Sequence, residues 1–486
     1  MSELILVLDE GTTSTRAMLF SAAGEPRGVA QAELTQHYPR PGWVEHDADE
    51  IWQRTLRCAG EMVERAGGAE RIAAIGITNQ RETVVAWDRQ SGAPLARALV
   101  WQDRRTADAC AALREAGHED RVRERTGLLL DPYFSATKMR WLLDHRPAVA
   151  EAAAAGRLAF GTIESWLTFK LTGAHVSDAA NASRTLLLPL AGPSWDESLC
   201  ELFGVPHAAL PEVTDSAGAL GTTTLFGPAI PICGLAGDQQ AATIGQGCLA
   251  PGETKATYGT GAFVLSNRGA ALPRSDHRLL GTVLHQLGGE RHYALEGSVF
   301  VAGSFVHWLR DSLGLIGSSA ETEALARSVP DSGGVVVVPA LSGMGAPHWR
   351  PEARGLIRGL SFATGKAHIV RAALQAMAHQ TRDLAAAFAA DGAAWRVLRI
   401  DGGMAANDWM AQDVADVTGL EVIRPHFVET TALGAAMLAA VGIGLHSTLE
   451  AAAAEMIGPR RHFHPRMSDD ERAQRVAAWD AALASV

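Results

Sequence analysis

Three glycine turns in the sequence combine hydroxyl or carboxylate side chains with backbone that can approach an anion closely. They occupy residues 9–13 (Asp-Glu-Gly-Thr-Thr), 259–261 (Gly-Thr-Gly) and 401–403 (Asp-Gly-Gly). Glycine exposes backbone N–H groups and threonine adds hydroxyl donors, so such turns suit phosphate groups. A carboxylate such as Asp9 suits a hydrated Mg²⁺ ion, which neutralises phosphate charge at one remove. Any one Gly-Thr turn is most often only a tight turn, so the prediction of a phosphate site depends on the three together.

Short apolar runs flank the first turn. Residues 4–8 and 16–20 have the length and composition of strands, and a turn at residues 23–25 leads into a third segment. This pattern predicts a meander of antiparallel strands. It differs from a P-loop or a dinucleotide-binding unit, because both of those need a helix directly after the glycines.

Strands and helices then alternate, which favours an α/β fold. The apolar spacing predicts a helix over residues 49–65, with Asp47 or Asp49 as its N-cap, and a buried strand over residues 72–77. Further helices are expected at residues 136–143 and 163–171, and a loop region at residues 206–234, which are rich in Gly, Pro and Thr.

The opening pattern recurs about 250 residues later. Residues 255–258 and 262–266 flank the second glycine turn as the first two strands flank the first one. The third turn follows an apolar run at residues 397–400, and Asn407 is expected to cap a helix that continues through Val417. This repetition predicts two domains of the same type, residues 1–248 and 249–486.

The motifs around these turns resemble those of one family along almost the whole chain. The turns are similar to the two phosphate motifs and the adenosine motif of the actin-like ATPase superfamily. Within it the chain resembles the FGGY carbohydrate kinases, most closely the members that phosphorylate glycerol. The segments that match in order are residues 77–83 (Ile-Thr-Asn-Gln-Arg-Glu-Thr), 101–105 (Trp-Gln-Asp-Arg-Arg), 181–185 (Asn-Ala-Ser-Arg-Thr), 237–241 (Gly-Asp-Gln-Gln-Ala) and 429–436 (Glu-Thr-Thr-Ala-Leu-Gly-Ala-Ala).

The resemblance implies two RNase-H-like domains with an interdomain cleft, in which ATP and Mg²⁺ bind opposite a polyol such as glycerol. It implies that Asp238 is the general base and that Asp9 lies at the metal. The nucleotide-binding residues it implies are Thr12, Thr13, Ser14, Arg16, Thr260, Gly303, His307, Gly403 and Asn407. The polyol-binding residues it implies are Arg81, Glu82, Trp101, Tyr133, Asp238, Gln239 and Phe263. It also implies a cytoplasmic enzyme that forms a homodimer or homotetramer.

Each of these residues also has an ordinary structural interpretation. Arg81 and Glu82 alone would more often form a weak surface ion pair, and Trp101 could be a boundary aromatic residue. Two other functions therefore stay open: a kinase for another short polyol or sugar, such as erythritol or xylulose, and a non-catalytic actin-like module. The combination of charged and aromatic residues favours an enzyme, because discrimination of a triol needs donors and acceptors in fixed geometry.

The sequence departs from the family pattern at Glu10, where Gln is common, and at His307. We expect Glu10 to add negative charge beside the metal turn. No Lys or Arg occurs from Thr185 through Thr254, so we expect no counterpart of the loop that binds fructose 1,6-bisphosphate in some relatives.

Composition limits the remaining function classes. The formal net charge is −11, from 43 Lys and Arg against 54 Asp and Glu, which argues against a general nucleic-acid binder.

The five cysteines have no metal-ligand spacing, and we expect reduced thiols. Residues 432–445 are apolar but too short for a bilayer span, so a packed interior helix is predicted. No positive segment precedes the first short apolar run, and Asp9 interrupts that run early, so no signal peptide is predicted.

Overall fold

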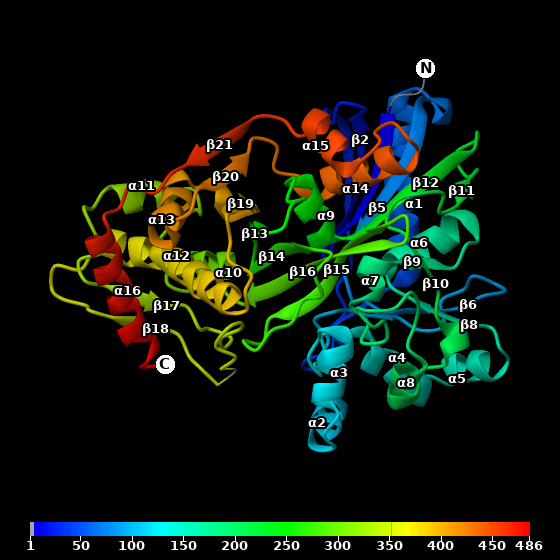
Figure 1. Cartoon of the computed structure of the whole chain (residues 1–486), viewed down its shortest axis with the longest axis horizontal. Helices are drawn as coiled ribbons and strands as arrows, with labels where there is room; N and C mark the ends of the chain where they lie inside the picture. Colours follow the sequence, from blue (N-terminus) through cyan, green and yellow to red (C-terminus); the bar gives the residue numbers. More distant parts are fainter. Residues whose placement is uncertain (1–3, 351) are drawn as a thin grey trace.

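The described chain forms two large β-sheets that lie side by side, each covered by helices (Figure 1). This computed structural model describes residues 4–350 and 352–486; residues 1–3, on which the signal-peptide prediction depends in part, lie outside them. The six-stranded sheet, here called the first sheet, has the order β11 (Thr222–Thr223), β12 (Ile230–Gly237), β5 (Ile72–Asn79), β1 (Leu4–Glu10), β2 (Ser14–Ser21) and β3 (Pro26–Glu33).

The seven-stranded sheet, here called the second sheet, repeats that plan. Its order is β15 (Leu280–Leu287), β16 (Glu290–Val299), β14 (Ala262–Gly269), β13 (Glu253–Tyr258), β19 (Val397–Asp401), β20 (Val422–Pro425) and β21 (Arg460–Phe463). In the first sheet β12, β5 and β1 are parallel, and β2 and β3 continue antiparallel. In the second, β20, β19 and β13 are parallel, and β14 and β16 continue antiparallel. The predicted fold class, two α/β units of one type, is confirmed.

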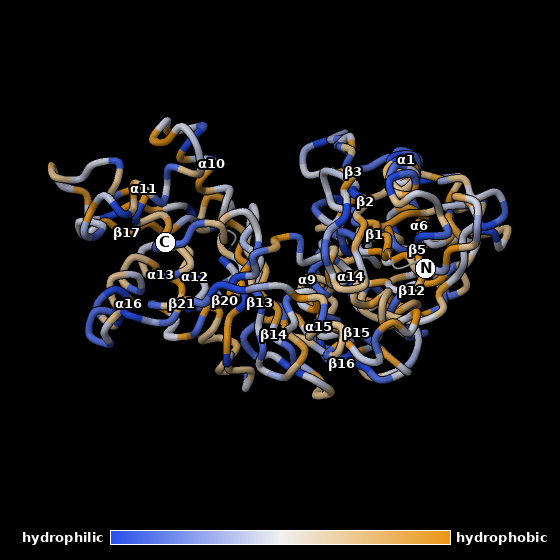
Figure 2. The backbone as a smooth tube through the Cα atoms, turned by 90° about the horizontal axis from the view of Figure 1, so that it is seen from above, coloured by the Kyte–Doolittle hydropathy of each residue, from blue (hydrophilic) through white to orange (hydrophobic). Residues whose placement is uncertain are grey.

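Helices cover the first sheet on both faces. The apolar core on one face includes side chains of α1 (Ala48–Ala66) and α6 (Ile163–Thr172). The other core includes α9 (Asp238–Gly245), α14 (Thr430–Gly442) and α15 (Leu449–Met456). The buried, apolar strand β1 is visible inside this part of the molecule in Figure 2. The N-cap prediction for α1 is confirmed, because the Asp47 side chain accepts from the backbone N–H groups of Asp49 and Glu50.

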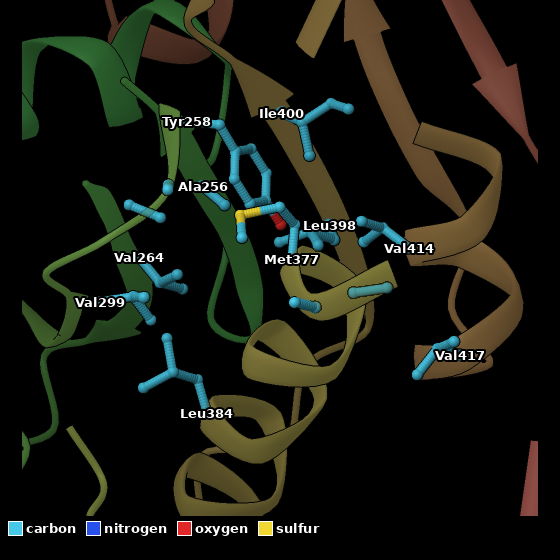
Figure 3. Close-up of a cluster of buried hydrophobic side chains, with 14 of the residues drawn as sticks. Ala256, Tyr258, Val264, Val299, Met377, Leu384, Leu398, Ile400, Val414 and Val417 are labelled. Atoms are coloured by element: carbon cyan, nitrogen blue, oxygen red, sulfur yellow. The ribbon is translucent and has the colours of Figure 1, made fainter. Parts of the chain in front are cut away.

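The core of the second sheet packs against α12 (Lys366–Ala390) and α13 (Asp408–Thr418). Figure 3 shows the Tyr258 ring of β13 lying against Met377 of α12, with Ile400 of β19 in the same cluster of buried side chains. The predicted cap of α13 is also confirmed, since the Asn407 side chain accepts from the N–H of Met410 at 2.9 Å.

One late segment of the chain returns to the first sheet. α14 packs on α9, β12, β5 and β1, and Figure 1 shows it beside those strands. This is the predicted interior helix. It approaches α9 so closely that a Cβ at Gly434 would lie 1.8 Å from the carbonyl oxygen of Ala241. The division of the chain at residues 248 and 249 stays a prediction.

Smaller elements complete the described chain. The remaining helices are α2 (Ala107–Glu115), α3 (Glu119–Thr126), α4 (Ser135–His145), α5 (Pro147–Ala154), α7 (Ala179–Ala182), α8 (Glu197–Phe203), α10 (Gly303–Asp311), α11 (Glu321–Arg327) and α16 (Asp469–Leu483). Short strand pairs are β4 (Glu45–His46) with β7 (Ala98–Leu99), β6 (Val85–Asp88) with β8 (Leu158–Gly161), β10 (Glu212–Thr214) with β9 (Val176–Asp178), and β17 (Val336–Val338) with β18 (Leu356–Arg358).

One prediction was wrong in part. Residues 206–234 were expected to be a loop, but β10 and β11 lie within that range and β12 begins at Ile230. The Gly and Pro content concealed a strand that pairs in parallel with β5. None of the helices in residues 4–350 and 352–486 combines the length and apolar character that a membrane span requires.

Candidate active site

Three parallel strands of the first sheet deliver polar side chains to one edge. Asp9 is next to last in β1, Arg81 and Glu82 follow the end of β5, and Asp238 follows the end of β12. Because the order is β12-β5-β1, the carboxyl ends of the three strands are neighbours. This is where α/β sheets place ligand sites. Asp9 and Asp238 are close enough that the charge of Asp238 helps to raise the pKa of Asp9.

Asp238 is the first residue of α9 and a third of its side chain is exposed. Its carboxylate accepts from the backbone N–H of Gln239 at 2.7 Å and lies 3.5 Å from Nε of Arg81. Burial raises the pKa of Asp238 above its usual range, while the charges of Arg81 and Lys255 oppose that rise. The result is a carboxylate that solvent or a ligand can reach, with the basicity expected of a proton acceptor.

Arg81 and Glu82 are not a surface ion pair, because only 3% and 1% of their surfaces are exposed. The Arg81 guanidinium donates to both oxygens of Glu296, at 2.6 and 3.0 Å. Glu82 accepts from Nε of Arg184 at 2.6 Å. Glu82 has a φ of 61°, a backbone region that is costly for a residue with a Cβ and that recurs at functional sites.

Two aromatic side chains, Tyr133 and Trp101, connect this polar cluster to the first glycine turn. The Tyr133 hydroxyl accepts from Arg81 at 3.3 Å, and the rings of Tyr133 and Trp101 meet edge to face at 5.6 Å. The indole N–H of Trp101 donates to the Thr12 hydroxyl at 2.9 Å. Arg81, Glu82, Trp101, Tyr133 and Asp238 are therefore brought together.

Two other predicted polyol residues have different positions. Gln239 follows Asp238 in α9, and its side-chain oxygen accepts from the Lys255 ammonium. Phe263 is half-buried on β14 of the second sheet, where it pairs in register with Thr257. Phe263 therefore belongs to the second sheet, whereas the other six predicted polyol-binding residues belong to the part of the chain that forms the first sheet.

The first glycine turn connects β1 to β2, with Thr12 and Thr13 partly or fully exposed and Ser14 nearly buried. Burial raises the pKa of Asp9 to about 7, and the nearby Arg16 opposes the rise. Arg16 lies across from Asp9 in the β1–β2 pair and donates to Glu429 at 2.7 Å. The Arg16 cation is thus paired with a carboxylate just before α14.

The expectation for Glu10 was wrong in two respects. Its side chain is fully buried, and one oxygen accepts short hydrogen bonds from the hydroxyls of Thr15 and Thr55. It therefore points toward α1 rather than into the turn. Burial raises the pKa of Glu10 to about 7, so near neutral pH it is a partly protonated internal group rather than a full negative charge beside a metal.

A cavity of about 610 Å³ lies beside the second and third glycine turns, and its volume is in the range of small-ligand sites. Five predicted nucleotide residues line it: Thr260, Gly303, His307, Gly403 and Asn407. Tyr258, Val306, Leu374 and Met404 add apolar surface, which suits a flat aromatic base. Thr12 and Thr13, in the first turn, and Ser14 and Arg16, on β2, do not line it.

Glycine is required where the third turn meets the second. Gly402 has a φ of 87°, and a Cβ there would lie 2.5 Å from the carbonyl oxygen of Tyr258. Gly403, in contrast, has open space where its Cβ would be. The backbone of the two turns is therefore packed together on one side and open to the cavity on the other.

Three buried charged residues at this site were missed by the sequence interpretation. Arg184, Lys255 and Glu296 have no exposed surface. Arg184 stands in one of the matched segments and Lys255 in the run before the second glycine turn, but neither was given a role, and Glu296 belongs to no motif. Lys255 and Glu296 lie in strands that carry other charged residues, such as Glu253 and Glu290, so neither stood out in the sequence, although Lys and Glu are almost never fully buried unless they are paired.

Comparison with known proteins identifies the class of enzyme as a kinase that phosphorylates an alcohol group. The models of the FGGY family of carbohydrate kinases match residues 4–245 for the N-terminal domain and 254–443 for the C-terminal domain. The chain belongs to this family.

Within this family, the chain is similar over nearly its whole length to several glycerol kinases. A glycerol kinase of Alcanivorax borkumensis is 54% identical over 99% of this chain and 98% of its own, and a glycerol kinase of Aromatoleum aromaticum is 54% identical with the same coverage. The crystal structure of Plasmodium falciparum glycerol kinase with ADP superposes with a TM-score of 0.94 at 34% identity, over 99% of this chain and 98% of that one.

Proposed function

We propose that this protein transfers the γ-phosphoryl group of ATP to glycerol and forms sn-glycerol 3-phosphate. The main support for this proposal is the position of Asp238, a partly exposed carboxylate that lies 3.5 Å from the buried Arg81 guanidinium. The names of the relatives support glycerol as the acceptor and ADP as a nucleotide ligand. A cytoplasmic location and a homodimer or homotetramer remain predictions.

In this proposal Asp238 accepts the proton of the attacking hydroxyl. Phosphoryl transfer needs alignment and charge stabilisation more than covalent help from the protein. The donors that would face the phosphates are the hydroxyls of Thr12, Thr13, Ser14 and Thr260, with Arg16 released from Glu429. The adenosine would occupy the cavity lined by Gly303, His307, Gly403 and Asn407.

The donor set at Asp9 suits Mg²⁺. Among the described residues no group of three or more His, Cys, Asp or Glu side chains could hold a metal. Mg²⁺ commonly uses one or two carboxylates, several waters and the phosphates of its nucleotide, so the single carboxylate of Asp9 fits a water-mediated contact. The cation would supply neutralisation of phosphate charge, and Asp9 would orient its water shell.

The polyol pocket has the groups needed to select a small triol. Arg81 donates, Glu82 and Asp238 accept, and the Tyr133 hydroxyl can do both. The rings of Trp101 and Phe263 would limit the length of the carbon chain. An analogue without one hydroxyl would leave a buried polar group unpaired, which lowers its reactivity strongly.

The test is a coupled ADP-release assay with a panel of glycerol, erythritol, xylulose and no acceptor. We expect glycerol to give the highest kcat/KM, with ADP and glycerol 3-phosphate formed in equal amounts. A higher kcat/KM for erythritol or xylulose would contradict the proposed substrate, and ADP release that no acceptor stimulates would contradict the proposed reaction.

A further inference from the structure

Glu296 has a position that none of the predicted roles uses. It lies on β16 of the second sheet, whereas Arg81 and Arg184 belong to the part of the chain that forms the first sheet. Its carboxylate accepts two hydrogen bonds from Arg81, at 2.6 and 3.0 Å, and one from Arg184, at 3.1 Å. Glu296 of the second sheet therefore holds two arginines that belong to the part of the chain forming the first sheet.

Arg81, Glu82, Arg184 and Glu296, here called the buried charge cluster, form a closed chain of ion pairs. Arg81 bonds Glu296, Glu296 bonds Arg184, and Arg184 bonds Glu82, which lies 3.8 Å from Arg81. Two positive and two negative charges balance. Although burial opposes it, the two arginines lower the pKa of Glu296 to about 2, so Glu296 is ionised at any pH at which the enzyme would be assayed.

Arg81 has other carboxylates within reach. Its Nε lies 3.5 Å from Asp238 and 3.8 Å from Glu82. The two-point bond to Glu296 holds the planar guanidinium in one orientation, because a carboxylate matches two of its N–H groups at once. Without that bond the guanidinium would be free to leave the orientation that holds its Nε 3.5 Å from Asp238, and the donor that would meet a polyol beside Asp238 would be displaced.

We propose that Glu296 is a positioning residue of the polyol site: it orients Arg81 and Arg184 from the opposite sheet, so that a correctly shaped acceptor pocket exists only when both sheets are assembled. This inference rests on the proposed function. Glu296 itself has no exposed surface and acts through the two arginines.

The experiment compares glycerol binding and turnover in the wild type and in Glu296→Gln. Glutamine keeps the shape of the side chain but removes the charge and one acceptor oxygen. Glycerol affinity is measured by calorimetry without nucleotide, and KM values for glycerol and for MgATP are measured by ADP release. We expect the Kd and KM for glycerol to rise at least about tenfold, while the KM for MgATP changes less than about twofold.

The matched control is Asp413→Asn. Asp413 is buried on α13, which packs on the second sheet, and makes a two-point bond to Arg475, at 2.6 and 2.9 Å, but it forms no hydrogen bond or ion pair with the buried charge cluster. We expect this variant to lower the melting temperature and to leave the glycerol KM unchanged. Equal effects of the two variants on the glycerol KM would overturn the proposal, because a general loss of stability would then explain both.

A second variant covers the case in which Glu296→Gln does not fold. Glu296→Asp keeps the charge but shortens the side chain by one methylene, so it should restore folding and weaken glycerol binding about threefold, as expected for partial loss of one hydrogen bond. Wild-type glycerol affinity in the folded variant would overturn the proposal. The wild-type assay separately tests the proposed function: if wild type does not phosphorylate glycerol, that function fails, whereas an unchanged variant beside an active wild type refutes the role of Glu296 alone.

Discussion

Replacement of Asp238 by Asn removes the proposed proton acceptor with little change in shape. The Asn oxygen can still accept from the N–H of Gln239, as the carboxylate does at 2.7 Å. Arg81 keeps its two hydrogen bonds to Glu296, so its orientation is preserved. The loss should therefore fall on the chemical step rather than on the pocket.

The size of that loss follows from the role of a general base. Such a group contributes about 10² to 10⁴ in rate, which corresponds to about 3 to 5 kcal/mol of barrier. We expect kcat for glycerol phosphorylation to fall by about that factor, while glycerol affinity measured by calorimetry stays within about threefold of wild type.

The assay needs a control for removal of a helix-terminal carboxylate. Asp196 offers one, because it caps α8 and accepts from the N–H of Leu199 at 3.1 Å, in a part of the fold without predicted site residues. Asp196→Asn should lower stability and leave kcat near wild type. If kcat of Asp238→Asn were within a few-fold of wild type, the assignment of Asp238 as the base would be refuted.

Three further predictions concern the surroundings of the site. Glu10→Gln should remove a pH dependence of stability: the folded pKa of Glu10 is raised from 4.5 to about 7, so its contribution is fully present below pH 4.5 and is lost as pH rises through about 7. Denaturant unfolding should show wild type losing about 3 kcal/mol relative to Glu10→Gln between pH 4.5 and 8, and parallel pH profiles would refute this. Trp101→Phe removes the indole N–H that bonds Thr12 at 2.9 Å but keeps an aromatic face, so kcat/KM for MgATP should fall up to about tenfold with a smaller change in glycerol affinity; the reverse pattern would contradict a role of this bond at the phosphate turn. Gly403→Leu should project into the open cavity and raise the KM for ATP at least about tenfold, with Gly403→Ala as the milder control; an unchanged KM for ATP in the leucine variant would place the nucleotide elsewhere.

Local signals in the sequence predicted the elements that depend on neighbouring residues. The glycine turn between β1 and β2, the Asp47 cap of α1 and the Asn407 cap of α13 each involve groups a few residues apart. The recurrence of strand, Gly-Thr turn and strand predicted two similar units, and the matching order of the parallel and antiparallel strands confirms it. Assignment of roles to Asp238 and to the polyol residues came from the resemblance and remains a prediction.

Features that depend on distant partners were not predictable in the same way. Glu296 bonds Arg81 across 215 positions of sequence, so no local spacing could reveal the pair. β12 was overlooked because its two glycines and one proline are typical of loops, whereas the parallel pairing with β5 decides its conformation. The burial of Glu10 reversed the expectation of an added charge, because its two threonine partners, Thr15 and Thr55, come from β2 and α1.

A crystal structure with glycerol, Mg²⁺ and a non-hydrolysable ATP analogue tests the central claim most directly. We expect one Asp238 oxygen within about 3.2 Å of a terminal glycerol hydroxyl, with the γ-phosphate in line beyond that hydroxyl and the adenine in the cavity beside Gly403. A glycerol molecule that bonds Arg81 but leaves its nearest hydroxyl out of reach of Asp238, or a nucleotide bound outside that cavity, would contradict it.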